Sequence, residues 1–179
     1  RGTKILCINE DGSVVVNATL SPADAGAVTF TSSNSSVVTV DENGNVVAVA
    51  EGEATITISY AGDDKYNAAE SKIVAVSVSL IDASVVAEDI TLFVGDNATI
   101  GAVTSPEGLD VTYTPDNSGV VTVDDNGVVT AVKNGTATIT LSVGGDGKYV
   151  ENSTTITVTV NKIDTSISVD VGSLDLKVD

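Results

Sequence analysis

The stretch Val37–Ile58, VVTVDENGNVVAVAEGEATITI, decides the fold because it returns as Val120–Leu141, VVTVDDNGVVTAVKNGTATITL. Valine alternates with threonine in both copies, which is the period of a β-strand with one buried face. Asn43-Gly44 and Asn126-Gly127 interrupt the alternation. Asn-Gly between two β-branched runs is a strong hairpin signal, because both positions of a two-residue turn need a positive φ. Each copy is therefore predicted to form three short strands.

The repeat extends well beyond this stretch. Val28–Tyr66 matches Val111–Tyr149 at a constant offset of 83 residues, with 25 of 39 positions identical. We predict one β-sandwich of about seven strands at residues 1–80 and a second at 82–162, giving an all-β chain. Val38, Val40, Ile56 and Ile58 are expected inside the first sandwich, with Val121, Val123, Ile139 and Leu141 inside the second.

The composition excludes several classes of partner. The net charge is −17, with 25 acidic and 8 basic residues. Nucleic-acid and anionic-lipid binding both need clustered Lys and Arg, so neither is expected. No apolar run approaches the ~20 residues of a membrane-spanning helix, so no membrane insertion of this segment is expected.

The residue types also argue against an enzyme. Nucleophilic catalysis by Ser or Cys needs a neighbouring base, most often His, and the chain has no His. The carboxylates have little aromatic material around them that could shift their pKa values, since aromatic residues make up only 3% of the chain. We expect no catalytic residue and no cofactor. Cys7 has no partner for an intrachain disulfide; it is interpreted as a small buried side chain, and an intermolecular crosslink is the alternative.

Two loop features are candidates for binding, and both have a structural explanation. Acidic turns such as Asp41–Asn45 resemble fragments of calcium loops, but they lack the ligands spread over twelve residues that an EF-hand needs. We expect no metal site; the best candidates for calcium would be Asp63, Asp64 and Asp146. Tyr66 and Tyr149 follow equivalent Gly-Asp loops, and each is expected to cover one end of its own sandwich.

Five Asn-x-Ser/Thr sequons are candidates for N-glycosylation: Asn17, Asn34, Asn97, Asn134 and Asn152. Asn17 alternates with Val16 and Ala18, so its side chain is predicted to point outward, as the modification requires.

The motif S-S-N-S-S-V-V-T-V-D-x-N-G, followed by V-x-A-V-x-x-G-x-A-T-I-T, resembles the bacterial immunoglobulin-like domains, chiefly the group 2 type. The G-D-x-K-Y loop is similar to related modules in adhesin-like surface proteins of methanogenic archaea. The resemblance covers nearly the whole chain. It implies tandem immunoglobulin-like sandwiches. Domains of this family have many different functions, so the resemblance does not specify one of them.

Three functions remain open. The favoured one is a structural or adhesive repeat module of an extracellular cell-surface protein or filament. Tandem sandwiches can project a tip or build a fibre, and their acidic, threonine-rich faces keep them soluble outside the cell. Its expected partners are neighbouring copies or repeats of the same protein and a glycan or protein on a host or cell surface. The alternatives are an accessory domain of a phage tail or capsid and a stand-alone carbohydrate- or protein-binding module.

The two ends of the chain differ in a way that suggests assembly. The first unit lacks a counterpart of Ala83–Asp89, whereas Ile81-Asp82-Ala83-Ser84 returns as Ile163-Asp164-Thr165-Ser166. Residues 163–179 therefore read as the opening of a third repeat or as a donor strand that completes the first sandwich of the next subunit. A third reading has the tail fold back on its own chain. The apolar positions of this tail are Ile167, Val169, Val171, Leu174, Leu176 and Val178.

Overall fold

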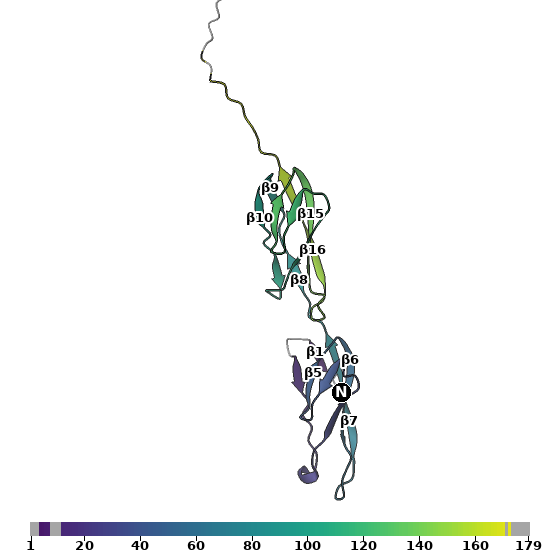
Figure 1. Ribbon diagram of the computed structural model, residues 1–179. Helices are drawn as coiled ribbons and strands as arrows, with labels where there is room; N and C mark the ends of the chain where they lie inside the picture. Colours follow the sequence, from purple (N-terminus) through teal and green to yellow (C-terminus); the bar gives the residue numbers. More distant parts are fainter. Residues whose placement is uncertain (1–3, 8–11, 171, 173–179) are drawn as a thin grey trace, which may run out of the picture. The chain divides into compact units, whose positions relative to one another are not determined.

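The computed structural model describes residues 4–7, 12–170 and 172, and its described part is all-β apart from one 3₁₀ turn, η1 (Ala23–Ala25) (Figure 1). The predicted fold class is thus confirmed. The strands of the first repeat are β1 (Lys4–Cys7), β2 (Ser13–Val15), β3 (Thr29–Ser32), β4 (Val38–Val40), β5 (Asn45–Ala48), β6 (Gly52–Tyr60) and β7 (Ala69–Ser79). Those of the second are β8 (Ser84–Val86), β9 (Ile90–Phe93), β10 (Asn97–Thr99), β11 (Val103–Ser105), β12 (Thr112–Pro115), β13 (Val121–Val123), β14 (Val128–Ala131), β15 (Gly135–Val143) and β16 (Asn152–Asn161).

The first repeat is built from two sheets. One has the strand order β1-β7-β6-β3 and the other has the order β2-β5-β4. β1 runs parallel to β7, and the other pairs with a printed register are antiparallel. Val38 and Val46 from the smaller sheet form one core cluster with Ile56, Val76 and Val78 from the larger sheet. Within their strands these residues alternate with exposed or half-buried neighbours, so the valine–threonine period does select the inner face; Val37, just ahead of β4, is also buried.

The second repeat contains the same two sheets and one additional strand pair. Its larger sheet has the order β12-β15-β16-β9, and its smaller sheet has the order β10-β14-β13. β9 runs parallel to β16, as β1 does to β7. The additional pair is β11-β8, which has no counterpart among the described residues of the first repeat.

The hairpin between β4 and β5 exists, but its turn differs from the prediction. The Gly44 amide donates to the Asp41 carbonyl at 3.1 Å, and the Asp41 amide donates to the Asn45 carbonyl at 3.0 Å, which leaves three residues in the loop. Gly44 closes that loop at φ +79°. The Asp41 carboxylate accepts hydrogen bonds from the Asn43 and Asn45 amides, each at 2.9 Å. The prediction of a two-residue Asn-Gly turn was wrong because this carboxylate stabilises the longer loop.

Five of the eight predicted core residues are buried, and the other three are half-buried. The buried ones are Val38, Ile56, Val121, Ile139 and Leu141. Val40 and Val123, each the last residue of a strand before the acidic turn, are half-buried, as is Ile58 on β6. Ile58 marks a difference between the two repeats, because its counterpart Leu141 is fully buried.

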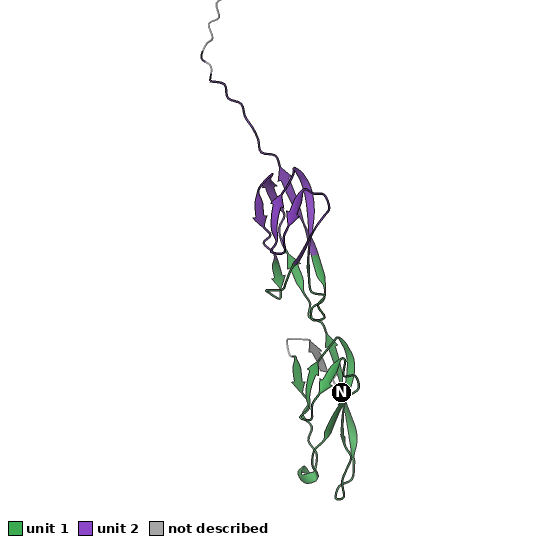
Figure 2. Cartoon of the chain, in the orientation of Figure 1, with its two compact units in different colours: residues 1–86, 103–111, 142–153 green, residues 87–102, 112–141, 154–179 purple. Residues whose placement is uncertain are grey.

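The chain divides into two compact units, residues 1–86, 103–111 and 142–153 and residues 87–102, 112–141 and 154–179 (Figure 2). β15 and β16 have residues in both units. This division does not coincide with the boundary between the repeats, so the domain limits read from the sequence stay a prediction.

The segment after β16 joins none of the sheets formed by the described residues. Ile163, Ile167 and Val169 are 66%, 95% and 72% exposed, so their apolar side chains are not packed on the described part of the chain. The other tail positions singled out above, Val171, Leu174, Leu176 and Val178, lie outside the described residues.

Ile56→Ala is expected to lower the free energy of unfolding of the first repeat by ~2–5 kcal/mol, because Ile56 is fully buried and the change leaves a cavity. Ile73→Ala on the neighbouring strand β7 is the control, since that side chain is 55% exposed and should cost less than ~0.5 kcal/mol. Urea denaturation of the full chain measures both. Equal costs for the two variants would contradict the inner face assigned to β6.

Candidate assembly site on the first repeat

In the second repeat, a short leading strand closes one edge. β8 pairs antiparallel with β11, with Ser84 opposite Ser105, Val85 opposite Thr104 and Val86 opposite Val103. Alternate residues of the leading segment point inward, since Ala83 and Val85 are 7% and 3% exposed. β8 therefore provides hydrogen-bond partners for the backbone of β11, and the segment that contains β8 also buries apolar side chains.

In the first repeat, Thr19–Ser21 occupies the position of β11, and no strand equivalent to β8 lies among the described residues. Val14 pairs with Val46 as Ala98 pairs with Val129, and this places Thr19–Ser21 at the position of Val103–Ser105. Within the described part of the chain, no strand pairs with Thr19–Ser21. The backbone of this segment is an unpaired edge.

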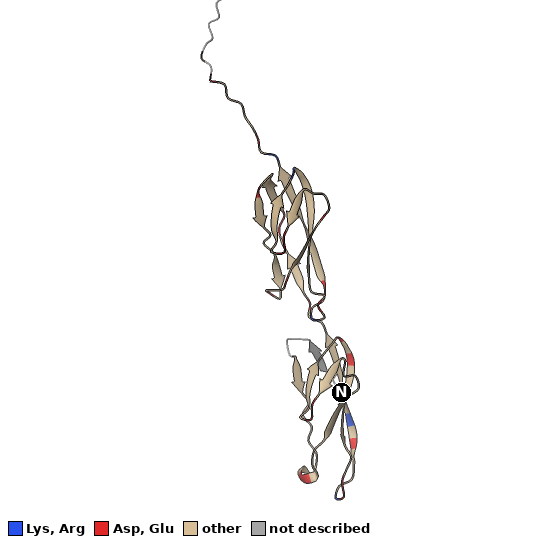
Figure 3. Ribbon diagram, viewed as in Figure 1, with Lys and Arg blue, Asp and Glu red and all other residues tan. Residues whose placement is uncertain are grey.

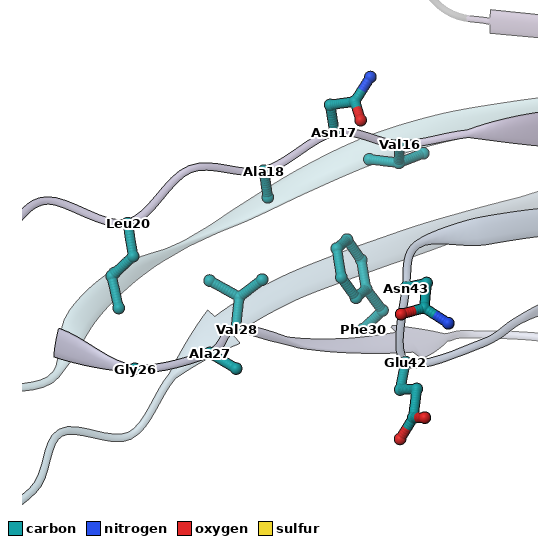
Figure 4. Close-up of a pocket in the computed structure, with 10 residues that line it drawn as sticks. All are labelled: Val16, Asn17, Ala18, Leu20, Gly26, Ala27, Val28, Phe30, Glu42 and Asn43. Atoms are coloured by element: carbon teal, nitrogen blue, oxygen red, sulfur yellow. The ribbon is translucent and has the colours of Figure 1, made fainter. Parts of the chain in front are cut away.

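An open groove runs along this edge. It has a volume of about 370 Å³, and its apolar lining comes from Ala18, Leu20, Val28, Ile58, Tyr60 and Ala69. A second hollow of about 250 Å³ shares Ala18, Leu20 and Val28 and adds Val16 and Phe30. Figure 4 shows Ala18 and Leu20 pointing from their segment toward the segment of Val28 and Phe30, while Asn17 points away.

Two residues that line the groove are more exposed than their counterparts in the second repeat. Ile58 and Tyr60 are half-buried, whereas Leu141 and Val143 are 0% and 2% exposed. Val28, which also lines the groove, is half-buried, as is its counterpart Val111.

The acidic residues are placed mainly in turns (Figure 3); of those in the described part, only Glu53 and Glu70 lie within strands. Several of their carboxylates accept hydrogen bonds from backbone amides of the same turn. Asp63 accepts hydrogen bonds from the Lys65 and Tyr66 amides, each at 2.7 Å, and Asp146 does the same for the equivalent loop at 2.9 Å. These hydrogen bonds stabilise the ionised form, so the pKa of each carboxyl is lowered.

The Tyr66 side chain contacts η1 of its own repeat through Asp24. The Asp24 carboxylate accepts a hydrogen bond from the Tyr66 hydroxyl at 2.7 Å and forms an ion pair with Lys65 at 2.9 Å. Lys65 and then Tyr66 lower the pKa of Asp24. The Lys65 ammonium also lies 4.6 Å from the centre of the Tyr66 ring, a geometry that Lys148 and Tyr149 repeat at 5.0 Å. The Tyr66 side chain therefore links its own loop to η1.

Comparison with known families identifies the repeats. The family model described as "Bacterial Ig-like domain (group 2)" matches residues 3–69, and the one described as "Bacterial Ig-like domain" matches residues 109–162. The chain is a tandem of bacterial immunoglobulin-like domains. No curated protein sequence matches it.

Solved structures similar to these Ig-like domains align loosely. The crystal structure of the S-layer protein rSbsC(31-844) is 22% identical with a TM-score of 0.42, covering 79% of this chain and 21% of that chain. Drosophila N-cadherin EC1-3 is 12% identical with a TM-score of 0.37, covering 89% of this chain and 64% of that chain. This chain thus spans about a fifth of the SbsC structure. TM-scores this low carry no conclusion about function.

The five sequons lie on the surface of the two Ig-like domains. Asn17, Asn34, Asn97, Asn134 and Asn152 are all exposed. Asn134 differs from the others because its side-chain amide donates to the Val160 carbonyl at 2.9 Å, a bond that attachment of a glycan would disturb. Glycosylation itself stays a prediction.

The sequence analysis expected the first Ig-like domain to lack a counterpart of Ala83–Asp89, but it did not single out the edge residues beside which such a segment would lie. The signal was the alignment of Ser21-Pro22 with Ser105-Pro106, which places Thr19 and Leu20 on the unpaired edge. The side chain of Cys7 lies outside the described residues.

We predict that calcium does not stabilise either Ig-like domain. The carboxylates of the acidic loops already accept backbone hydrogen bonds, and the described residues contain no cluster of three potential metal ligands. Calcium needs six to eight oxygen ligands. The melting temperature should be the same in millimolar Ca²⁺ and in chelator. A rise of several degrees that the chelator reverses would contradict this prediction.

Asp63→Asn should lower the melting temperature at pH 7, because the folded loop favours the ionised carboxylate. A carboxyl with a lowered folded-state pKa contributes stability above its unfolded pKa and loses that contribution as the pH falls through the folded pKa. The deficit of the variant should therefore shrink below about pH 4. Asp64→Asn is the matched control, because no backbone amide of the described residues donates to its side chain. A pH-independent deficit, or an equal one in the control, would disprove the account.

Proposed function

We propose that the chain is a structural, adhesive repeat module of an extracellular cell-surface protein or filament, without a catalytic role. The observation that carries the proposal is the direct succession of two Ig-like domains. β7 ends at Ser79 and β8 begins at Ser84. Between them, the Ile81 amide donates to the Lys148 carbonyl at 3.0 Å, and the Ile81 carbonyl accepts from the Val150 amide at 2.9 Å. A connection held by backbone hydrogen bonds suits a load-transmitting repeat better than a flexible tether.

The side-chain chemistry supports a structural role. Among the described residues, no polar or charged side chain is buried, so none is held in the desolvated setting that tunes catalytic groups. The six aromatic residues form no exposed patch of the kind that stacks on sugars, since only Phe93 is exposed. The described part contains no helix long and apolar enough to cross a membrane.

The surface chemistry supports an extracellular setting. The outward faces of the strands carry threonine and serine, and the net charge of −17 keeps like surfaces apart. The resemblance of the G-D-x-K-Y loop to archaeal surface adhesins, stated above, points the same way.

Antibodies raised against the purified chain should label intact cells of the source organism, and treatment of those cells with an external protease should remove the signal. An antibody against a cytoplasmic protein is the control for cell integrity. Labelling only after permeabilisation would contradict the proposal. Labelling of purified virions in place of cells would also contradict it and would favour the phage accessory domain.

A further inference from the structure

We propose that the parallel pair of β9 and β16 is the mechanical clamp of the second Ig-like domain. The clamp consists of Ile90–Phe93, residues 158–161 of β16 and the side chain of Asp89. It resists force that is pulled through the chain, and its failure releases the whole domain. The proposal rests on the structural role proposed above, because a surface repeat transmits force between its neighbours. Its tests use the purified chain, so their failure would say nothing against an extracellular location.

The direction of the two strands decides how force acts on them. β9 comes first in the sequence and β16 last among the strands of the larger sheet, and the two lie side by side and parallel (Figure 1). Ile90 lies opposite Val158 at one end of the pair. Phe93 lies opposite Asn161 at the other end. Force pulled through the chain enters at the first end and leaves at the second. The strands are therefore pulled past each other along their length, and their evenly spaced hydrogen bonds are loaded together.

Further hydrogen bonds lengthen the clamp at both ends. Directly ahead of β9, the Asp89 carboxylate accepts a hydrogen bond from the Thr157 amide of β16 at 2.7 Å. Directly after β9, the Val94 amide donates to the Asn161 carbonyl at 3.0 Å. A hydrogen bond to a carboxylate is stronger than one between neutral groups. Asp89 therefore strengthens the clamp at the end where the force enters.

β8 lies ahead of the clamp on the path of the force. It pairs with β11 over three residues, and Ile81 adds two backbone hydrogen bonds. Only residues 87–89 separate β8 from β9. Release of β8 would therefore lengthen the chain by one short segment and pass the load to β9. The rest of the domain stays folded until the clamp fails, so the clamp sets the mechanical resistance.

The first Ig-like domain repeats this arrangement. β1 runs parallel to β7 in the larger sheet, with Lys4 opposite Val76 and Cys7 opposite Ser79. Four paired positions are found in each domain. The parallel pair is thus a feature of the repeat, and the same load can act lengthwise on each domain of the tandem.

The first experiment pulls the second domain in two directions with optical tweezers. Two forms of the full chain carry Cys7→Ser and Glu88→Cys, and handles are attached to the introduced cysteines. The lengthwise form adds Lys162→Cys, just after β16, so the clamp is loaded along its strands. The peeling form adds Thr155→Cys, ahead of the residues of β16 that pair with β9, so the bonds are loaded one after another. All three attachment residues are exposed, and β8 lies outside the path of the force in both forms.

At the same constant force, the lengthwise form should stay folded longer than the peeling form by roughly tenfold or more, because several hydrogen bonds must break together and forced unfolding is governed by the unfolding rate. Equal lifetimes, or a longer lifetime of the peeling form, would overturn the proposal. This comparison needs no change within the clamp, so it decides the proposal even where a clamp variant does not fold.

The second experiment tests Asp89 in the lengthwise form. Asp89→Ala removes the acceptor of the Thr157 amide and should shorten the lifetime at constant force by roughly tenfold. Asp116→Ala is the matched control, because the Asp116 carboxylate accepts from the Thr138 amide at the same 2.7 Å but extends the pair of β12 and β15. This bond is still intact when the clamp fails, so its loss should shorten the lifetime less than about twofold.

Urea denaturation gives the equilibrium stability of both variants, against which the lifetimes under force are compared. A purely structural role would make each lifetime follow the equilibrium stability. Equal shortening by the two variants, or an Asp89→Ala chain that lasts as long as its parent, would overturn the part assigned to Asp89 and with it the proposed clamp.

Discussion

Backbone pairing along the short edge that precedes the Ser-Pro turn determines how complete each Ig-like domain is. In the second domain β8 occupies this edge and adds the buried side chain of Val85. Among the described residues of the first domain, no strand pairs with the same edge, and Ile58 and Tyr60 in the adjoining groove are half-buried. The strand that pairs with this edge therefore both satisfies backbone groups and covers apolar surface.

Acidic residues restrict the ways in which such a chain can associate. With a net charge of −17, broad face-to-face contact between copies is disfavoured. The aspartates also have a local task, since Asp41, Asp63 and Asp146 each accept backbone hydrogen bonds in a turn. The same residues thereby fix the loops and limit non-specific contact.

The strand segments and the repeat were readable from the sequence, because valine–threonine alternation marks each strand and the constant offset of 83 residues relates the two copies. The hairpin loop was not readable, because the Asp41 side chain stabilises a three-residue loop where Asn-Gly alone indicates a two-residue turn. The burial of Ile58 could not be predicted from its own strand either. It depends on whether a segment far away in sequence, or in another chain, covers the groove, and no periodicity of β6 carries that information.

Amide hydrogen exchange tests the open edge most directly, because it compares the two domains within one molecule. In dilute solution, amides of Thr19–Ser21 should exchange much faster than those of Val103–Ser105, which β8 protects. Equal protection of the two segments in the dilute monomer would mean that the edge of the first domain is already paired, and it would contradict the account.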